Sequence, residues 1–444
     1  MFRTQLEMLQ LSSNILKNVV QNKAMKISSR LQHKTRKVNE KLQPKLSADV
    51  VQFLDKTPEY CEIKNKLPNY LLRKYKAPEN MYLINRGTAK TIADTIKDYL
   101  TEESPIVEVN PGLGFLSEEL LKCQNNHIYM YEISHHFTQY ISNLQAQHPD
   151  RITFKVADFF GMWKLAFRDK MDQGNRIQEL LGDLSTDNNT RVVKVIGAMP
   201  GLSFVKHLIN NIIFHNTTNQ LGIPDLFITM PGHNYKFLTD VEVQLSKQKI
   251  VPTLFQLLFN CKVLTNVPRY HFLPWTSPTA AKQTNSVDEY NLYLVNITQK
   301  EKLPCPPQYL PLLWYFFKPH MFSKSTRVIP MLEQWIPGCG VRLITGQDPS
   351  DTNKLLLPDE NDAQLPHMTI FTQFGDLNLN QKITVFKRFI SWPEFEQCQF
   401  RITMENNLPR FVTELQSDDK DSIPTHIDDL DHSDVESDLS DFDK

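Results

Sequence analysis

Short apolar runs alternate with stretches of helical periodicity between about residue 81 and residue 230. Runs rich in β-branched residues predict strands, and apolar positions spaced by three and four predict helices. The predicted strands are residues 106–109, 128–131, 152–156, 192–196 and 225–230, and the predicted helices are 116–123, 134–146 and 203–215. Repeated strand–helix units favour a doubly wound, mostly parallel α/β sheet that binds its ligand at the carboxyl ends of the strands.

The pattern changes after about residue 300, where four prolines occur at positions 304, 306, 307 and 311. Helical periodicity returns at residues 310–318, 326–335, 379–390 and 394–404. We therefore predict an α/β domain over 60–300 and a smaller helical C-terminal domain over 301–416. The polar segment 168–190 fits neither a strand nor a helix, and we interpret it as an insertion. The polar segment 347–366 is predicted to be a loop.

The N-terminal segment is basic and amphipathic. Residues 1–45 contain ten Lys and Arg residues and two Glu. One helical stripe carries its apolar residues, which are Phe2, Leu6, Leu9, Leu16 and Val20. This pattern is typical of a mitochondrial presequence and predicts a mitochondrial protein. An exposed helix with a basic face, or an arm that binds nucleic acid, is the alternative.

The C-terminal segment 417–444 is acidic, with eleven Asp and Glu residues and two Lys. Its low hydrophobicity predicts disorder. It is either a solvating tail or a flexible polyanion that screens a basic nucleic-acid surface. The chain between the two ends has balanced charge, so nucleic-acid binding would need a local basic patch.

Composition excludes several classes of protein. The chain has 444 residues, of which 41% are hydrophobic, and that content can build folded cores. No apolar run approaches the roughly 18 residues of a membrane span. The six Cys residues form no CxxC pair, which argues against a zinc site and against a disulfide framework. We predict no metal site.

The strongest motif follows the first strand of the α/β region. Glu108-Val-Asn-Pro-Gly112-Leu-Gly114 lies between this strand and the next helix. Closely spaced glycines allow a tight turn and a close approach of the backbone to a ligand at the helix N-terminus. A full dinucleotide fingerprint would have a third Gly at position 117, where Ser stands. This departure disfavours a nicotinamide oxidoreductase, which remains the weakest alternative.

Acidic residues occur at the ends of the next two strands. Glu132 stands where a carboxylate can accept hydrogen bonds from both ribose hydroxyls. Asp158 stands where an acid can accept a proton from the exocyclic amine of adenine. Together with the glycine turn, they indicate a pocket for an adenosine-containing cofactor that has no pyrophosphate. This description points to S-adenosylmethionine. Otherwise these acids are helix caps and solvated loop residues.

These motifs resemble those of the ribosomal RNA adenine dimethyltransferase family. The resemblance covers roughly residues 60–345, from the Asn80-Met-Tyr-Leu83 segment onward. The stretches Lys194–Pro200 and His271–Ser277 are similar to the mitochondrial transcription factor B branch. The resemblance implies a Rossmann-like methyltransferase sheet in which Leu83, Glu132 and Asp158 contact S-adenosylmethionine. We assign Glu108, Gly112 and Gly114 to the same cofactor pocket.

The chain departs from this family at the site for the target base. Active members carry Asn or Asp, an apolar residue, Pro and an aromatic residue after the fourth strand. Here the stretch reads Gly197-Ala-Met-Pro-Gly201, so both the polar side chain and the aromatic ring are missing. We therefore expect feeble methyl transfer, and we assign no catalytic residue.

Two basic clusters are candidates for binding nucleic acid. We single out Lys74 and Lys76 before the α/β region, and Lys324 and Arg327 in the helical region. A solvated basic face is the alternative for each cluster. The resemblance implies a factor in the mitochondrial matrix nucleoid that opens promoter DNA. Its implied partners are the mitochondrial RNA polymerase and the high-mobility-group factor that bends DNA. An active small-subunit rRNA dimethyltransferase, with rRNA as its partner, is the second hypothesis.

Overall fold

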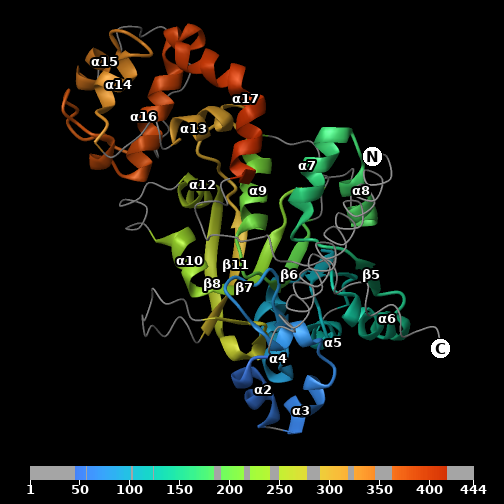
Figure 1. Ribbon diagram of the computed structural model, residues 1–444. Coiled ribbons are helices and arrows are strands. Elements are labelled where there is room, and N and C mark those ends of the chain that lie inside the picture. Colours follow the sequence, from blue (N-terminus) through green and yellow to red (C-terminus); the bar gives the residue numbers. More distant parts are fainter. Residues whose placement is uncertain are drawn as a thin grey trace, which may run out of the picture. The chain divides into compact units, whose positions relative to one another are not determined.

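The computed structural model describes residues 46–56, 58–101, 104–123, 125–184, 192–214, 221–240, 250–277, 291–318, 325–345 and 363–417 (Figure 1). The predicted presequence, the acidic tail beyond residue 417, most of the predicted loop at 347–366 and Lys324 lie outside these residues. The chain divides into two compact units, one ending at Lys74 and one beginning at Tyr75. The domain boundaries at residues 60, 300 and 416 remain predictions.

The first unit is a small helical segment. It contains α2 (Ala48–Asp55), α3 (Pro58–Lys64) and a 3-10 helix, η1 (Asn69–Leu72), before β1 (Lys74–Tyr75). Val50 and Leu54 of α2 are buried, as are Tyr60 and Ile63 of α3. Because these apolar residues recur at spacings of three and four, each helix has one buried face.

A seven-stranded sheet organises the second unit. Its strands are β3 (Ile106–Val109), β4 (Ile128–Glu132), β5 (Ile152–Val156), β6 (Lys194–Ala198), β7 (Asp225–Pro231), β8 (Phe259–Pro268) and β11 (Asn291–Gln299), in the order β5-β4-β3-β6-β7-β11-β8. The strands β3 to β7 pair in parallel, and β11 pairs antiparallel with both β7 and β8. This confirms the predicted mostly parallel α/β sheet. The strands β8 and β11 were not predicted.

Apolar side chains cover both faces of this sheet. Val107, Val109 and Val195 belong to the large hydrophobic core that includes α9 (Ser203–Phe214) and α12 (Ile250–Leu258). Their strand neighbours Glu108 and Ile196 point to the opposite face, toward α4 (Arg86–Ile96) and α5 (Phe115–Cys123). Helices on both faces of parallel strands are the doubly wound arrangement.

Further short elements complete the α/β part. They are β2 (Tyr82–Leu83), paired with β9 (Phe272–Leu273), β10 (Trp275–Thr276), the helices α6 (Thr138–Gln147) and α10 (Gly232–Thr239), and the 3-10 helices η2 (Lys97–Tyr99), η3 (His135–Phe137) and η5 (Arg269–His271). The predicted helix at 134–146 is thus a 3-10 turn followed by α6.

The interpretation of 168–190 as a segment without helical structure was wrong for its described part. Helix α7 (Met162–Asp172) runs into it, and α8 (Arg176–Leu181) and η4 (Gly182–Leu184) follow. Arg176 lies 3.0 Å from the Asp169 carboxylate and 2.7 Å from that of Asp172. Asp169 also accepts the Ile177 N–H at 2.9 Å. The charged side chains of this segment therefore pair with one another. Ile177 and Leu180 of α8 are buried.

The C-terminal part is helical. It contains η7 (Pro307–Tyr309), α13 (Leu310–Phe316), α14 (Val328–Glu333), α15 (Cys339–Thr345), η8 (Phe374–Asp376), α16 (Leu379–Ser391), η9 (Pro393–Gln397) and α17 (Gln399–Ser417). Phe316 packs at its centre, with its ring 5.2 Å from that of Phe386 and 6.2 Å from that of Phe389. Helices α13 and α17 contact α9, so this part shares its hydrophobic core with the sheet (Figure 1).

In the part of the chain that the structure describes, every helix is too short or too polar to cross a membrane.

Candidate cofactor site and acceptor loop

The loop between β3 and α5 has the backbone that its glycines predict. Gly112 and Gly114 have φ angles of +60° and +78°, and Asn110 has a φ of +55°. A Cβ atom on Gly112 would lie 3.0 Å from Cδ1 of Tyr82. Both the positive φ and this close approach require glycine at position 112. The loop therefore places backbone close to any ligand at the N-terminus of α5.

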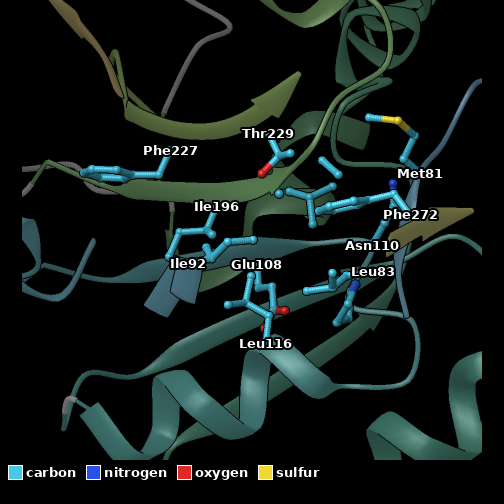
Figure 2. Close-up of a pocket in the computed structure, with 14 residues that line it drawn as sticks. Met81, Leu83, Ile92, Glu108, Asn110, Leu116, Ile196, Phe227, Thr229 and Phe272 are labelled. Carbon is cyan, nitrogen blue, oxygen red and sulfur yellow. The ribbon is translucent and has the colours of Figure 1, made fainter. Parts of the chain in front are cut away.

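A pocket lies where this loop meets the ends of β6 and β7 (Figure 2). Glu108 and Leu83, two of the predicted cofactor residues, line it. Asn110 and Pro111 of the glycine loop line it as well, and most of the remaining wall is apolar. Thr229 at the end of β7 adds a hydroxyl that the sequence analysis did not single out. The structure thus brings two predicted residues together with unpredicted ones.

Glu108 is the buried acid of this pocket. It is 2% exposed, and its Oε2 atom has no hydrogen-bond partner among the described residues. Burial raises the pKa of Glu108 to about 7; the Ser117 hydroxyl lowers it and the nearby Glu132 carboxylate raises it further. Burying a carboxylate oxygen without a hydrogen-bond partner costs free energy of folding. A hydrogen-bond donor on a bound ligand would supply the partner.

Glu132 ends β4 and is completely buried. Its Oε2 accepts the Gly112 N–H at 3.0 Å, and its Oε1 accepts the Ser134 N–H at 2.8 Å and the Tyr82 hydroxyl at 3.1 Å. Burial raises the pKa of Glu132 to about 7, against the lowering effect of these hydrogen bonds. A carboxylate has about four lone-pair sites; the Gly112 and Ser134 N–H groups occupy two of them, and a backbone hydrogen bond from Ile133 also lowers the pKa of Glu132. Tyr82, which the sequence analysis did not assign, occupies another.

Asp158 lies two residues beyond the end of β5. Its Oδ1 accepts the Gly161 N–H at 2.8 Å, and its Oδ2 lies 3.9 Å from the Lys164 ammonium. Asp158 therefore stabilises the turn that leads into α7. It is not part of the pocket that Glu108 lines, and its contact with adenine remains a prediction.

The titration of Glu108 gives a testable pH dependence. Because burial raises the pKa of this carboxyl to about 7, above the roughly 4.3 expected for an unfolded chain, its contribution to the free energy of unfolding is lost as pH rises from about 4 to about 7. Glu108→Gln should match the wild type at pH 4 and be more stable by roughly 3 to 4 kcal/mol at pH 8. Urea denaturation at both pH values measures this difference. The same change at the exposed Glu79 is the control, and equal stability of Glu108→Gln and wild type at pH 8 would contradict the prediction.

The acceptor loop, Gly197–Gly201, begins with the last two residues of β6, Gly197 and Ala198, which line the same pocket. The Met199 N–H donates to the Thr229 carbonyl at 2.9 Å, and the Asn234 side chain donates to the Pro200 carbonyl at 2.7 Å. These bonds hold the backbone of the loop in place without a polar side chain at position 198. A Cβ atom on Gly201 would meet nothing within 4 Å, so the place of the family's aromatic ring is open.

The predicted basic residues are in different environments. Lys74 forms an ion pair with Asp49. Lys76 is exposed. Arg327 is exposed and immediately precedes α14. Their binding of nucleic acid remains a prediction, as does that of Lys324.

The His, Cys, Asp and Glu residues within the described ranges form no group of three or more that could hold a metal ion.

Comparison with known proteins places the chain in a family. The sequence profile of the ribosomal RNA adenine dimethylase family matches residues 73–347, the part that contains the glycine loop, Glu132 and the acceptor loop. The chain belongs to the ribosomal RNA adenine dimethylase family. Within it, the chain is 35% identical over 381 residues to the dimethyladenosine transferase 2, mitochondrial, of Drosophila melanogaster, covering 78% of this chain and 84% of the relative.

Two solved structures of methyltransferases are also similar. The 23S rRNA methyltransferase ErmE is 15% identical, with a TM-score of 0.41, over 69% of this chain and 99% of that protein. A dimethyladenosine transferase from Plasmodium falciparum is 11% identical, with a TM-score of 0.38, over 69% of this chain and 97% of that protein.

Ribosomal RNA adenine dimethylases depend on S-adenosylmethionine, which supplies an electrophilic methyl group when bound. The residues present fit this cofactor. The left-handed glycine loop allows close approach, and the buried Glu108 offers a carboxylate oxygen without a partner. Glu132 is completely buried and is not among the residues that line the pocket, so its contact with the ribose remains a prediction. We would place Leu83 and Glu108 in contact with the cofactor and Glu132 at its ribose.

Proposed function

We propose that this protein is a mitochondrial transcription initiation factor that assists promoter melting and binds unpaired DNA. The observation that carries the proposal is the acceptor loop, which keeps its backbone but has Ala198 and Gly201 where the family holds and stacks the target base. A loop without those side chains retains room beside the pocket but lacks the groups that fix a base for methyl transfer.

In this proposal, different residues maintain the cofactor pocket and bind the DNA strands. Glu108, Gly112, Gly114 and Glu132 maintain the cofactor side of the scaffold, and Leu83 and Asp158 complete it. Basic side chains at Lys74, Lys76, Lys324 and Arg327 would bind phosphates of the separated strands. Strand binding requires no covalent step, so it tolerates the loss of the methyl acceptor groups. We place the α/β domain at 60–300, the helical domain at 301–416 and the acidic tail at 417–444.

The setting of this function is the mitochondrion. The Drosophila relative is a mitochondrial protein, and residues 1–45 have the composition of a presequence. We place the protein in the matrix nucleoid with the mitochondrial RNA polymerase, the high-mobility-group factor and promoter DNA.

Run-off transcription tests the proposal. Purified polymerase and high-mobility-group factor on a linear promoter template should give transcript only when this protein is added. A template with a pre-melted bubble should reduce the requirement, because the strands are already separated. Equal yield with and without the protein on the linear template would contradict the proposal.

An active small-subunit rRNA adenine dimethyltransferase is the second candidate. Membership of the family and the open Oε2 of buried Glu108 favour it. Transfer of tritium from labelled S-adenosylmethionine to a stem-loop RNA tests this function, and no transfer at high protein concentration would exclude it.

A further inference from the structure

An exposed aromatic side chain lies on a short turn of the helical part. Phe371 is 64% exposed, and its neighbour Ile370 is 51% exposed. The turn is ordered by its own threonines: the Thr369 N–H donates to Thr372 Oγ1 at 2.9 Å, and the Phe371 N–H donates to Thr369 Oγ1 at 3.2 Å. Phe371 is therefore presented to solvent from a backbone that is already fixed.

The same turn is joined to the segment before α14. The Val328 N–H donates to the Thr372 carbonyl at 2.9 Å, and the Phe374 N–H donates to the Thr326 carbonyl at 2.9 Å. Arg327 lies between these bonds and forms a β-bridge with Gln373. The two backbone bonds flank Arg327 and hold it beside Phe371.

Arg327 and Phe371 form a cation–π pair. The guanidinium carbon lies 5.2 Å from the centre of the Phe371 ring. Arg327 is exposed and forms no ion pair within the described chain, so its charge is not neutralised there. Glu333, the acid nearest to Arg327 in sequence, accepts the N–H groups of Gly338 and Gly340. Asp376, the acid nearest to Phe371 in sequence, accepts the Gln373 N–H at 2.8 Å and completes a capping box. An aromatic face next to an unneutralised guanidinium is the combination that binds single-stranded nucleic acid.

We propose that Phe371 and Arg327 form a platform on which one unpaired nucleobase stacks, with Arg327 contacting the adjacent phosphate. This inference rests on the proposed function and identifies where the separated strand is held. Ring stacking needs a flat apolar face and tolerates any base, as a factor that binds melted DNA requires. A stable protein interface usually buries about 800 Å² per partner. This turn exposes two apolar side chains, Ile370 and Phe371, which is a small area for such an interface and favours a nucleobase over a protein partner.

Binding of a fluorescein-labelled single-stranded DNA to the full chain tests the platform by fluorescence anisotropy. Phe371→Ala should raise Kd about 5- to 150-fold, the range that the loss of one base–aromatic stack gives. Phe371→Trp should restore binding, whereas Phe371→Leu should not, because leucine is apolar but cannot stack. Ile370→Ala, on the same turn, is the matched control and should change Kd less than twofold.

A strand with abasic sites separates stacking from other effects. The wild type and Phe371→Ala should bind it equally, because no base is present to stack. An unchanged Kd for Phe371→Ala on normal DNA, or an equal loss on the abasic strand, would overturn the platform while leaving the proposed function standing. Loss of polymerase binding in Phe371→Ala without DNA would also overturn it, in favour of a protein contact. Failure of the wild type to bind single-stranded DNA would reject both proposals.

Discussion

The double variant Ala198→Asn/Gly201→Tyr is expected to raise methyl transfer to a stem-loop RNA by at least about 30-fold. The asparagine would supply a hydrogen-bond partner for the target amine, and the tyrosine would supply a stacking ring. Each contribution is about 1 to 3 kcal/mol, and 1.36 kcal/mol changes a rate tenfold. Ala198 lines the pocket, and a Cβ atom on Gly201 meets nothing within 4 Å.

The control for this gain is a variant of similar bulk without the chemistry. Ala198→Leu/Gly201→Leu fills the same positions but provides neither amide nor ring, so its methyl transfer should stay at the wild-type level. Tritium incorporation under single-turnover conditions measures the chemical step. The explanation based on the acceptor loop is wrong if the Asn/Tyr variant binds S-adenosylmethionine as the wild type does and still transfers no more methyl groups.

Glu132→Ala is expected to lower the free energy of unfolding by roughly 3 kcal/mol, because it leaves buried donors without an acceptor. The carboxylate accepts hydrogen bonds from the Gly112 N–H, the Ser134 N–H and the Tyr82 hydroxyl, and it is completely buried. Its loss should also loosen the glycine loop and weaken S-adenosylmethionine binding. Urea denaturation and isothermal titration calorimetry measure the two effects.

Asp158→Ala provides the comparison for Glu132. Asp158 also accepts a backbone N–H, from Gly161, but its side chain is 30% exposed and water can replace it. Its loss should cost about 1 kcal/mol, the typical value for a capping side chain. If the two variants lowered the free energy of unfolding equally, the hydrogen bonds of Glu132 would contribute no more to stability than the single turn hydrogen bond of Asp158.

Local patterns predicted those parts of the fold whose signal lies within a few residues. The strand at 106–109 and the one at 152–156 have the bounds of β3 and β5, because each contains three β-branched residues within four or five positions. The pattern at 168–190 failed because its charged residues pair with one another, Arg176 with Asp169 and Asp172, while the few apolar residues of α8 are buried. A count of polar residues does not reveal such pairing.

Some features of the candidate site could also be predicted from the sequence, and others could not. The sequence alone determined the glycine loop, the acid at the end of β4 and the loss of the acceptor side chains at Ala198 and Gly201, because each is a matter of residue type at a fixed distance from a strand. Only the tertiary structure decided that Tyr82 shares the Glu132 carboxylate and that Phe371 lies under Arg327. These pairs are 50 and 44 positions apart in the chain, and contacts between such distant residues depend on how the elements pack.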